Sequence, residues 1–265
     1  MTAPSPAPLR PKSLRIGRVI LIVHDLDRVS SFYQHAIGLH LISADASQAL
    51  LGVGDTVLLE LRRDPQARRH SPREPGLFHT AFLLPTRADL GAWLQHAVAT
   101  EQRLQGASDH LVSEAIYLTD PEGNGIEIYA DRPAAQWQWT NGLVTMATEP
   151  LDAPDLLASA AGITWGGFPP GATVGHVHLQ VGAIAPAEEF YAGLLGLDIT
   201  CRYPGATFFS SGHYHHHIAA NIWNSRGASA RIEPTTGIAE VEILAENAAP
   251  ASLRDPWGIA VTLSP

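Results

Sequence analysis

Short segments in which apolar residues dominate or alternate with polar ones recur along the chain and predict β-strands. The clearest lie over Gly17 to Val23 and Gly175 to Val181, with further strands predicted over Val57 to Leu61 and Ile218 to Trp223. After each strand that begins at a glycine, the pattern predicts a turn and a helix that ends at a Gly-Leu step suited to a C-cap. The local pattern therefore predicts a β-α-β-β-β unit.

This unit occurs more than once. A set of markers recurs 158 positions later in the chain: Gly17, Phe32-Tyr33 and Gly38-Leu39 return as Gly175, Phe190-Tyr191 and Gly196-Leu197. Weaker echoes begin at Gly76 and Gly237, and the first of these predicts a helix over Asp89 to Thr100 and a tight turn over Asp120 to Gly125. We therefore expect an α+β fold of four βαβββ modules, the last one abbreviated, which form paired, partly open mixed β-barrels with helices outside.

The modules suggest how the chain divides into domains. Residues 1–13 are rich in proline and alanine and are expected to be a flexible tail. Residues 14–132 and 171–265 are expected to form two domains, the second one shortened because few residues separate Ile243 from Asp255. Residues 133–170 contain Trp137 and Trp139 and end in Gly-Gly-Phe-Pro-Pro, which indicates a linker that packs across the surface.

Composition narrows the class of partner. The 265 residues are 45% apolar, which is enough for a substantial core, and the net charge is −9. A chain with this acidic balance lacks the basic field that binds nucleic acid or anionic lipid, so small molecules are the expected partners. The single cysteine, Cys201, excludes an internal disulfide, and no apolar run has the length of a membrane span. We expect a cytoplasmic protein, and the shortened last module can leave a sheet edge for a homo-oligomer contact.

A histidine cluster is the most unusual local feature. Four of the thirteen histidines lie between His213 and His217, directly before the apolar run that starts at Ile218. Imidazole is both a common metal ligand and a common acid or base near neutral pH. On composition alone, a catalytic role and a solvated, weakly metal-binding tract both remain open.

Three motifs, together with the repeated unit, connect this sequence with a known protein family. They are the segment Ser113 to Glu127, which contains Asp-Pro-x-Gly-Asn-x-x-Glu, the Gly-His-Val-His strand at Gly175 to His178, and the histidine cluster. Together with the modules, they resemble the vicinal oxygen chelate (glyoxalase/bleomycin resistance/dioxygenase) superfamily, and within it the two-domain type I extradiol catechol 2,3-dioxygenases. The resemblance implies an Fe(II)-dependent enzyme that cleaves the ring of a small aromatic diol with O₂.

The resemblance also implies a ligand set. In that family two histidines and one glutamate hold Fe(II) and leave positions open for substrate and O₂. The matching residues here are His79 and His176, each opening a first strand, and Glu127 in a last strand; His178 is the alternative to His176. In the usual enzymes all three ligands come from one half of the chain, whereas here neither half holds a full set. We therefore predict that the second module pairs with the third.

Acid/base and substrate-binding roles follow from the same resemblance. His216 matches the family's acid/base histidine, with His217 as the reserve candidate and His215 as a surface or packing residue. Tyr117 matches a tyrosine that bonds the substrate oxygen, and His110 resembles a further pocket histidine. A tyrosine with its ring in the core is the alternative interpretation of Tyr117.

Two other functions remain open on the same scaffold. One is a glyoxalase-like isomerase or lyase that uses Mn, Zn or Ni, for which Glu60 would supply a fourth ligand. Glu60 equally fits an ion-paired strand end, because two arginines follow soon after it. The other is a non-catalytic binder similar to bleomycin-resistance proteins, which would need no metal.

Overall fold

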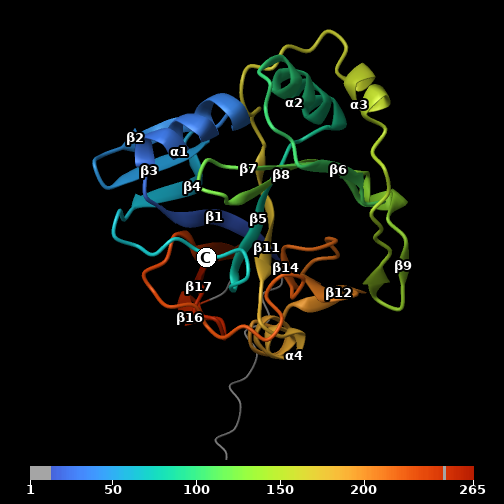
Figure 1. Ribbon diagram of the computed structural model, residues 1–265. Coiled ribbons are helices and arrows are strands. Elements are labelled where there is room, and N and C mark those ends of the chain that lie inside the picture. Colours follow the sequence, from blue (N-terminus) through green and yellow to red (C-terminus); the bar gives the residue numbers. More distant parts are fainter. Residues whose placement is uncertain (1–12, 247–248) are drawn as a thin grey trace, which may run out of the picture.

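The computed structural model describes residues 13–246 and 249–265 (Figure 1). All but the last residue of the predicted flexible tail, 1–13, therefore lie outside the described residues. The described chain forms two curled mixed sheets with helices at their outer sides, as expected for this α+β fold.

The first sheet combines the first and last modules. Its strands, in spatial order, are β16 (Ala251–Arg254), β17 (Ala260–Ser264), β15 (Gly237–Ala245), β1 (Leu14–Val23), β4 (Thr56–Arg63), β3 (Gln48–Val53) and β2 (His40–Ala44). The second sheet combines the two middle modules. Its order is β12 (Asp198–Tyr203), β13 (Ala206–Ser210), β14 (Ile218–Asn221), β11 (Thr173–Gln180), β5 (Gly76–Leu83), β8 (Gly125–Asp131), β7 (Ser113–Thr119) and β6 (Gly106–Asp109).

The predicted pairing of the second module with the third is confirmed by an antiparallel ladder between β5 and β11, in which His79 lies opposite His178. Strand β1 likewise pairs with β15, so each sheet takes strands from both halves of the chain. The division into domains at 14–132 and 171–265 stays a prediction.

The helices follow the repeat. In the first module α1 (Leu26–Phe32) continues as a π-helical turn, η1 (Tyr33–Ile37), and in the third α4 (Ile184–Glu188) continues as η3 (Glu189–Leu194). The second module carries α2 (Arg87–Ala99), whereas the described part of the fourth has no helix, which confirms that this module is abbreviated.

The Gly-Leu step ends the first helix as predicted. Gly38 has φ +100°, a left-handed conformation that favours glycine, and its N–H donates to the carbonyl of Tyr33. The Tyr33 ring is fully buried beside Phe82 of β5, so the helix packs onto the strand that carries His79.

The segment between the halves has structure of its own. It contains a 3₁₀ turn, η2 (Ala134–Gln136), a short hairpin of β9 (Trp139–Thr140) and β10 (Leu143–Val144), and α3 (Ala153–Ser159), which packs on α2. Trp137 is buried, and its indole N–H is shared between the carbonyls of Val112 and Arg132, at 3.1 and 3.0 Å. This segment is therefore tied to the second sheet. No described helix is long and apolar enough to cross a membrane.

In the first sheet, ion pairs occupy the region that corresponds to the histidine positions of the second. Arg18, the counterpart of His176, contacts Glu60 at 3.0 Å and Glu242 at 3.2 Å, and Glu60 also bonds Arg62 at 2.6 Å. Glu60 is thus a buried member of an ion-pair network, as its ion-paired interpretation predicted, and it belongs to the other sheet from His79 and His176.

Candidate metal centre

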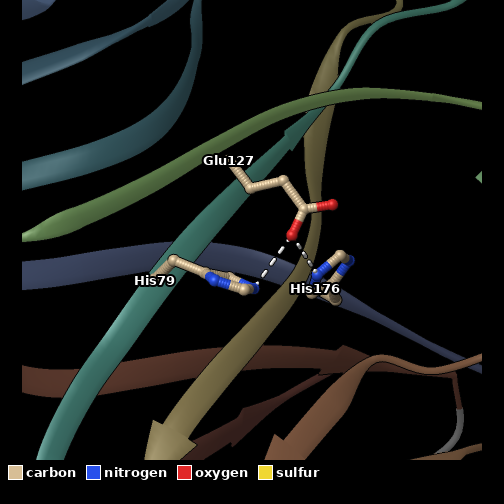
Figure 2. Close-up of side chains that lie close together, drawn as sticks. All are labelled: His79, Glu127 and His176. Atoms are coloured by element: carbon tan, nitrogen blue, oxygen red, sulfur yellow. Dashed lines mark hydrogen bonds and ion pairs between the residues drawn. The ribbon is translucent and has the colours of Figure 1, made fainter. Parts of the chain in front are cut away.

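Three neighbouring strands of the second sheet bring His79, Glu127 and His176 together (Figure 2). Glu127 Oε2 lies 2.9 Å from His79 Nε2 and 3.2 Å from His176 Nε2. One ligand atom from each residue lies within 4.8 Å of the other two, and all three side chains are buried. His79 and His176 lie inside β5 and β11, not at the first residue of each strand as the sequence suggested.

The donor set fits a divalent metal. His79 Nε2 is buried and, despite its closeness to Glu127, has no aligned hydrogen-bond partner among the described residues. A buried polar nitrogen without a partner is costly, and a metal ion is one way to satisfy it. Two imidazoles and one carboxylate converging on one side are the donors typical of non-haem Fe(II) sites that keep positions open.

The electrostatics favour the protonation states that ligands need. Burial lowers the pKa of His176 to about 4, so this imidazole is neutral near pH 7. Burial alone would raise the pKa of Glu127, but His176 and His79 on either side bring this pKa well below its usual range. A neutral imidazole and an ionised carboxylate are the forms that bind a metal.

Two irregularities in the β5–β11 ladder shape the part of the sheet that carries His79 and His176. The pairing skips Phe78 on one strand and Gly175 on the other, so each is an extra residue in a β-bulge. Successive residues of a regular strand face opposite sides, whereas Phe78 and His79 both line the same cavity. The bulge at Phe78 explains how neighbours on one strand reach one cavity.

Gly175 is required at the second bulge. A Cβ at this position would lie 1.8 Å from the hydroxyl oxygen of Tyr129, whose ring is 4.9 Å from that of His176. A side chain on residue 175 would therefore displace Tyr129 and disturb His176.

We expect Gly175→Ala to lower the free energy of unfolding by about 1–3 kcal/mol, the usual cost of overpacking a buried site. Gly106→Ala is the matched control, because Gly106 also lies in a strand but has no atom within 4 Å of the position that a Cβ would occupy. Denaturant midpoints of the two variants measure the difference. Equal midpoints would mean that Tyr129 moves aside without cost.

The histidine cluster lies outside the regular strands. His215, His216 and His217 precede β14 in irregular backbone, and all three are buried. His216 lines the cavity, with its ring centroid 4.0 Å from that of His176. His217 Nδ1 lies 2.8 Å from the hydroxyl of Ser210, so it packs away from the candidate metal centre.

His215 links His216 to a carboxylate that the sequence did not single out. Its Nδ1 lies 2.7 Å from His216 Nδ1, and its Nε2 lies 2.9 Å from Asp131 Oδ1. Asp131 accepts from His215 Nε2–H, which leaves His215 Nδ1 free to accept from His216 Nδ1–H. His216 Nε2 then carries no proton, and burial lowers the pKa of this histidine well below its usual range. The result is a neutral imidazole able to accept a proton.

Tyr117 and His110 lie together on the cavity wall. The Tyr117 hydroxyl is 2.6 Å from His110 Nε2, and His110 Nδ1 is 2.6 Å from the carbonyl of Ala147. Since Nδ1 must donate to that carbonyl, Nε2 is the nitrogen that accepts a hydrogen bond from the tyrosine O–H. Burial, followed by the charge of Glu127, raises the pKa of Tyr117, which keeps its hydroxyl protonated.

His178, the alternative ligand, is turned to a different partner. Its Nε2 lies 3.0 Å from the side-chain amide of Asn221, and it is outside the set of three converging ligand atoms. The ring still packs 4.9 Å from that of His79 and lines the cavity. Its position therefore favours a role in packing against the candidate ligand residues over a role as a ligand.

One cavity of about 800 Å³ is lined by the three candidate ligands and by His110, Tyr117, His178 and His216. Sequence reasoning named these residues but missed Phe78 and Trp223, which line the same cavity, and Asp131, which bonds His215. Phe78 stands next to His79, and Trp223 ends the apolar run after the histidine cluster, so their positions carried a signal. Asp131 is the last residue of β8, the strand that carries Glu127, and had no comparable signal.

Sequence comparison relates this chain to known proteins. Residues 15–128 match the family described as the Glyoxalase/Bleomycin resistance protein/Dioxygenase superfamily. A Bacillus subtilis (strain 168) protein named Catechol-2,3-dioxygenase is 40% identical over 232 residues, which cover 84% of this chain and 80% of that protein.

Structure comparison agrees on the fold. A putative dioxygenase from Bacillus subtilis superposes with a TM-score of 0.63 at 14% identity, over 97% of this chain and 87% of the other. Glyoxalase I from Zea mays superposes with a TM-score of 0.58 at 16% identity, over 95% and 92% of the two chains. At these identities the superpositions support the fold alone.

Proposed function

Because this chain belongs to the glyoxalase/bleomycin resistance protein/dioxygenase superfamily, we propose that it is an Fe(II)-dependent extradiol dioxygenase that cleaves a catechol-type substrate with O₂. The observation that carries this proposal is the convergence of His79, Glu127 and His176 on one wall of a cavity that His216 and Tyr117 also line. The 40% identical relative named Catechol-2,3-dioxygenase supports the same enzyme class.

Each residue of the cavity has a role in this proposal. Iron held by His79, Glu127 and His176 would bind the two catechol oxygens and activate O₂. Unprotonated Nε2 of His216 accepts a proton from a catechol hydroxyl, and general-base catalysis of this kind is worth roughly 10²–10⁴-fold in rate. The Tyr117 hydroxyl donates its hydrogen bond to His110 Nε2, so its oxygen is free to accept a hydrogen bond from a catechol hydroxyl, and His110 holds the tyrosine hydroxyl in place.

The test is direct. Protein purified without oxygen is analysed for iron, manganese, zinc and nickel, and is then mixed with catechol in air. A yellow ring-cleavage product and oxygen uptake that both require Fe(II) support the proposal. Metal bound without oxygen uptake on a panel of catechols would instead indicate an isomerase or lyase, and protein that binds no metal would indicate a binder.

The Asp131–His215 pair yields a further prediction, because it sets which nitrogen of His216 carries the proton. Asp131→Asn and His215→Phe should each lower kcat roughly 10–100-fold. This factor corresponds to the loss of one hydrogen bond to a charged group, which contributes about 1.5–3 kcal/mol. KM and bound iron should change little, since neither residue is in the group of converging ligand atoms.

Asp109→Asn is the matched control for Asp131→Asn, because Asp109 lies on β6 in an ion pair with Arg132, outside the cavity lining. It should keep kcat near that of the unchanged protein. Equal kcat values for Asp131→Asn and Asp109→Asn would remove the positioning role of Asp131.

A further inference from the structure

The cavity is much larger than an unsubstituted catechol requires. Its volume of about 800 Å³ lies in the upper part of the roughly 300–1,000 Å³ range of pockets that hold drug-sized ligands. The candidate metal centre lies at one wall, where a diol ring would be held by its two oxygens. Most of the cavity therefore remains for a substituent on that ring.

An aromatic wall leads away from the metal centre. Phe78 packs beside His79 with ring centroids 5.3 Å apart, and Trp223 packs edge-on against Phe78 and against His178, each at 5.4 Å. The wall thus runs continuously from a candidate metal ligand to Trp223.

Trp223 offers this cavity an apolar surface. Its indole N–H donates to the carbonyl of Pro204 at 2.9 Å, which fixes the ring and uses its polar atom. The residue nevertheless keeps 45% of its surface exposed, as does Tyr203, which also lines the cavity. Large half-exposed aromatic rings on a cavity wall are surfaces that a ligand can bury.

The cavity has little to offer a charged substituent. Among the described residues that line it, none is lysine or arginine, and Glu127 is the one carboxylate. Arg231 borders a small neighbouring pocket, but its guanidinium is paired with Glu233 at 2.5 Å and with the carbonyl of Ile238. A carboxylate on the substrate would lose its hydration here without gaining a cation.

We propose that the wall formed by Phe78 and Trp223 is a subsite for a bulky, uncharged aromatic or aliphatic substituent, and that the substrate is a catechol bearing such a group. This inference rests on the proposed dioxygenase function. It adds the class of substituent, which the family alone leaves open.

The test compares substrates on the iron-loaded protein. The panel is catechol, a phenyl-substituted catechol, a tert-butyl-substituted catechol and a catechol with a carboxymethyl group. We expect kcat/KM for the phenyl or tert-butyl compound to exceed that for catechol by at least about tenfold, the scale on which apolar pockets discriminate. The carboxymethyl compound should be at least about tenfold poorer than catechol.

Binding supplies a readout separate from turnover. Calorimetry without oxygen should rank the dissociation constants in the same order as kcat/KM. Trp223→Ala should reduce the preference for the phenyl compound over catechol roughly tenfold in both measurements. Ile232→Ala is the control, because Ile232 is 78% exposed and does not line the cavity, and it should leave the preference unchanged.

The outcomes separate the two proposals. Cleavage of catechols with catechol or the carboxymethyl compound preferred would overturn the subsite while leaving the dioxygenase function intact. A preference for bulky neutral catechols that Trp223→Ala leaves untouched would also overturn the assignment to this wall. Iron-loaded protein that cleaves no member of the panel would overturn the dioxygenase function, and the subsite with it.

Discussion

Replacing His79, Glu127 or His176 with alanine, one at a time, is expected to abolish iron binding and, with it, ring cleavage. Each residue supplies one of the three converging ligand atoms, and the described residues offer no other group of His, Cys, Asp or Glu with this geometry. Loss of one ligand should exceed the roughly 10–100-fold loss of metal affinity that follows from removing an outer partner. Iron per protein after anaerobic reconstitution is the measurement.

A structural cause for metal loss must be excluded, since all three side chains are buried. His40→Ala is the matched control, because His40 is exposed on β2 in the other sheet, and it should keep full iron. Thermal unfolding of the metal-free proteins shows whether each variant still folds. A folded variant that retains full iron would remove its residue from the ligand set.

Replacing His216 with alanine is expected to separate turnover from metal binding. The imidazole lies 4.0 Å from the His176 ring, measured between centroids, yet its Nδ1 is engaged by His215 and it is outside the converging set. Loss of a general base should lower kcat by roughly 10²–10⁴-fold while iron content stays nearly unchanged.

The histidine cluster itself provides the control for this variant. His213 is exposed with φ +58°, a left-handed conformation that asparagine tolerates, so His213→Asn tests a neighbouring histidine without backbone strain. Its kcat should match that of the unchanged protein. A His216→Ala protein that loses its iron would place His216 among the ligands and overturn its acid/base role.

The module architecture was accessible from the sequence because strand and helix periodicities are local properties. The 158-residue repeat predicted the order of the elements, and the helix expected over 89–100 lies over Arg87–Ala99. The pairing of the middle modules followed from chemistry: only together do they contain two histidines and a glutamate at the expected positions. The ladder between β5 and β11 bears out that reasoning.

The remaining features depend on contacts between distant residues. The bulges at Phe78 and Gly175 arise from the mutual register of two strands, which neither strand encodes alone. Asp131 meets His215 across 84 positions of sequence, so no local pattern indicated the pair. The separate partners of the histidines before β14 arise in the same way, because each imidazole is held by its own buried contact in irregular backbone.

The pairing of β5 with β11 also sets an order of events during synthesis. A nascent chain that has emerged only as far as the segment between the halves contains His79 and Glu127 but not His176. Such an intermediate presents two of the three donors and lacks β11, one of the two strands that lie beside β5 in the finished sheet. If the site holds iron as proposed, the metal is therefore expected to be captured late, after residues near 176 have left the ribosome.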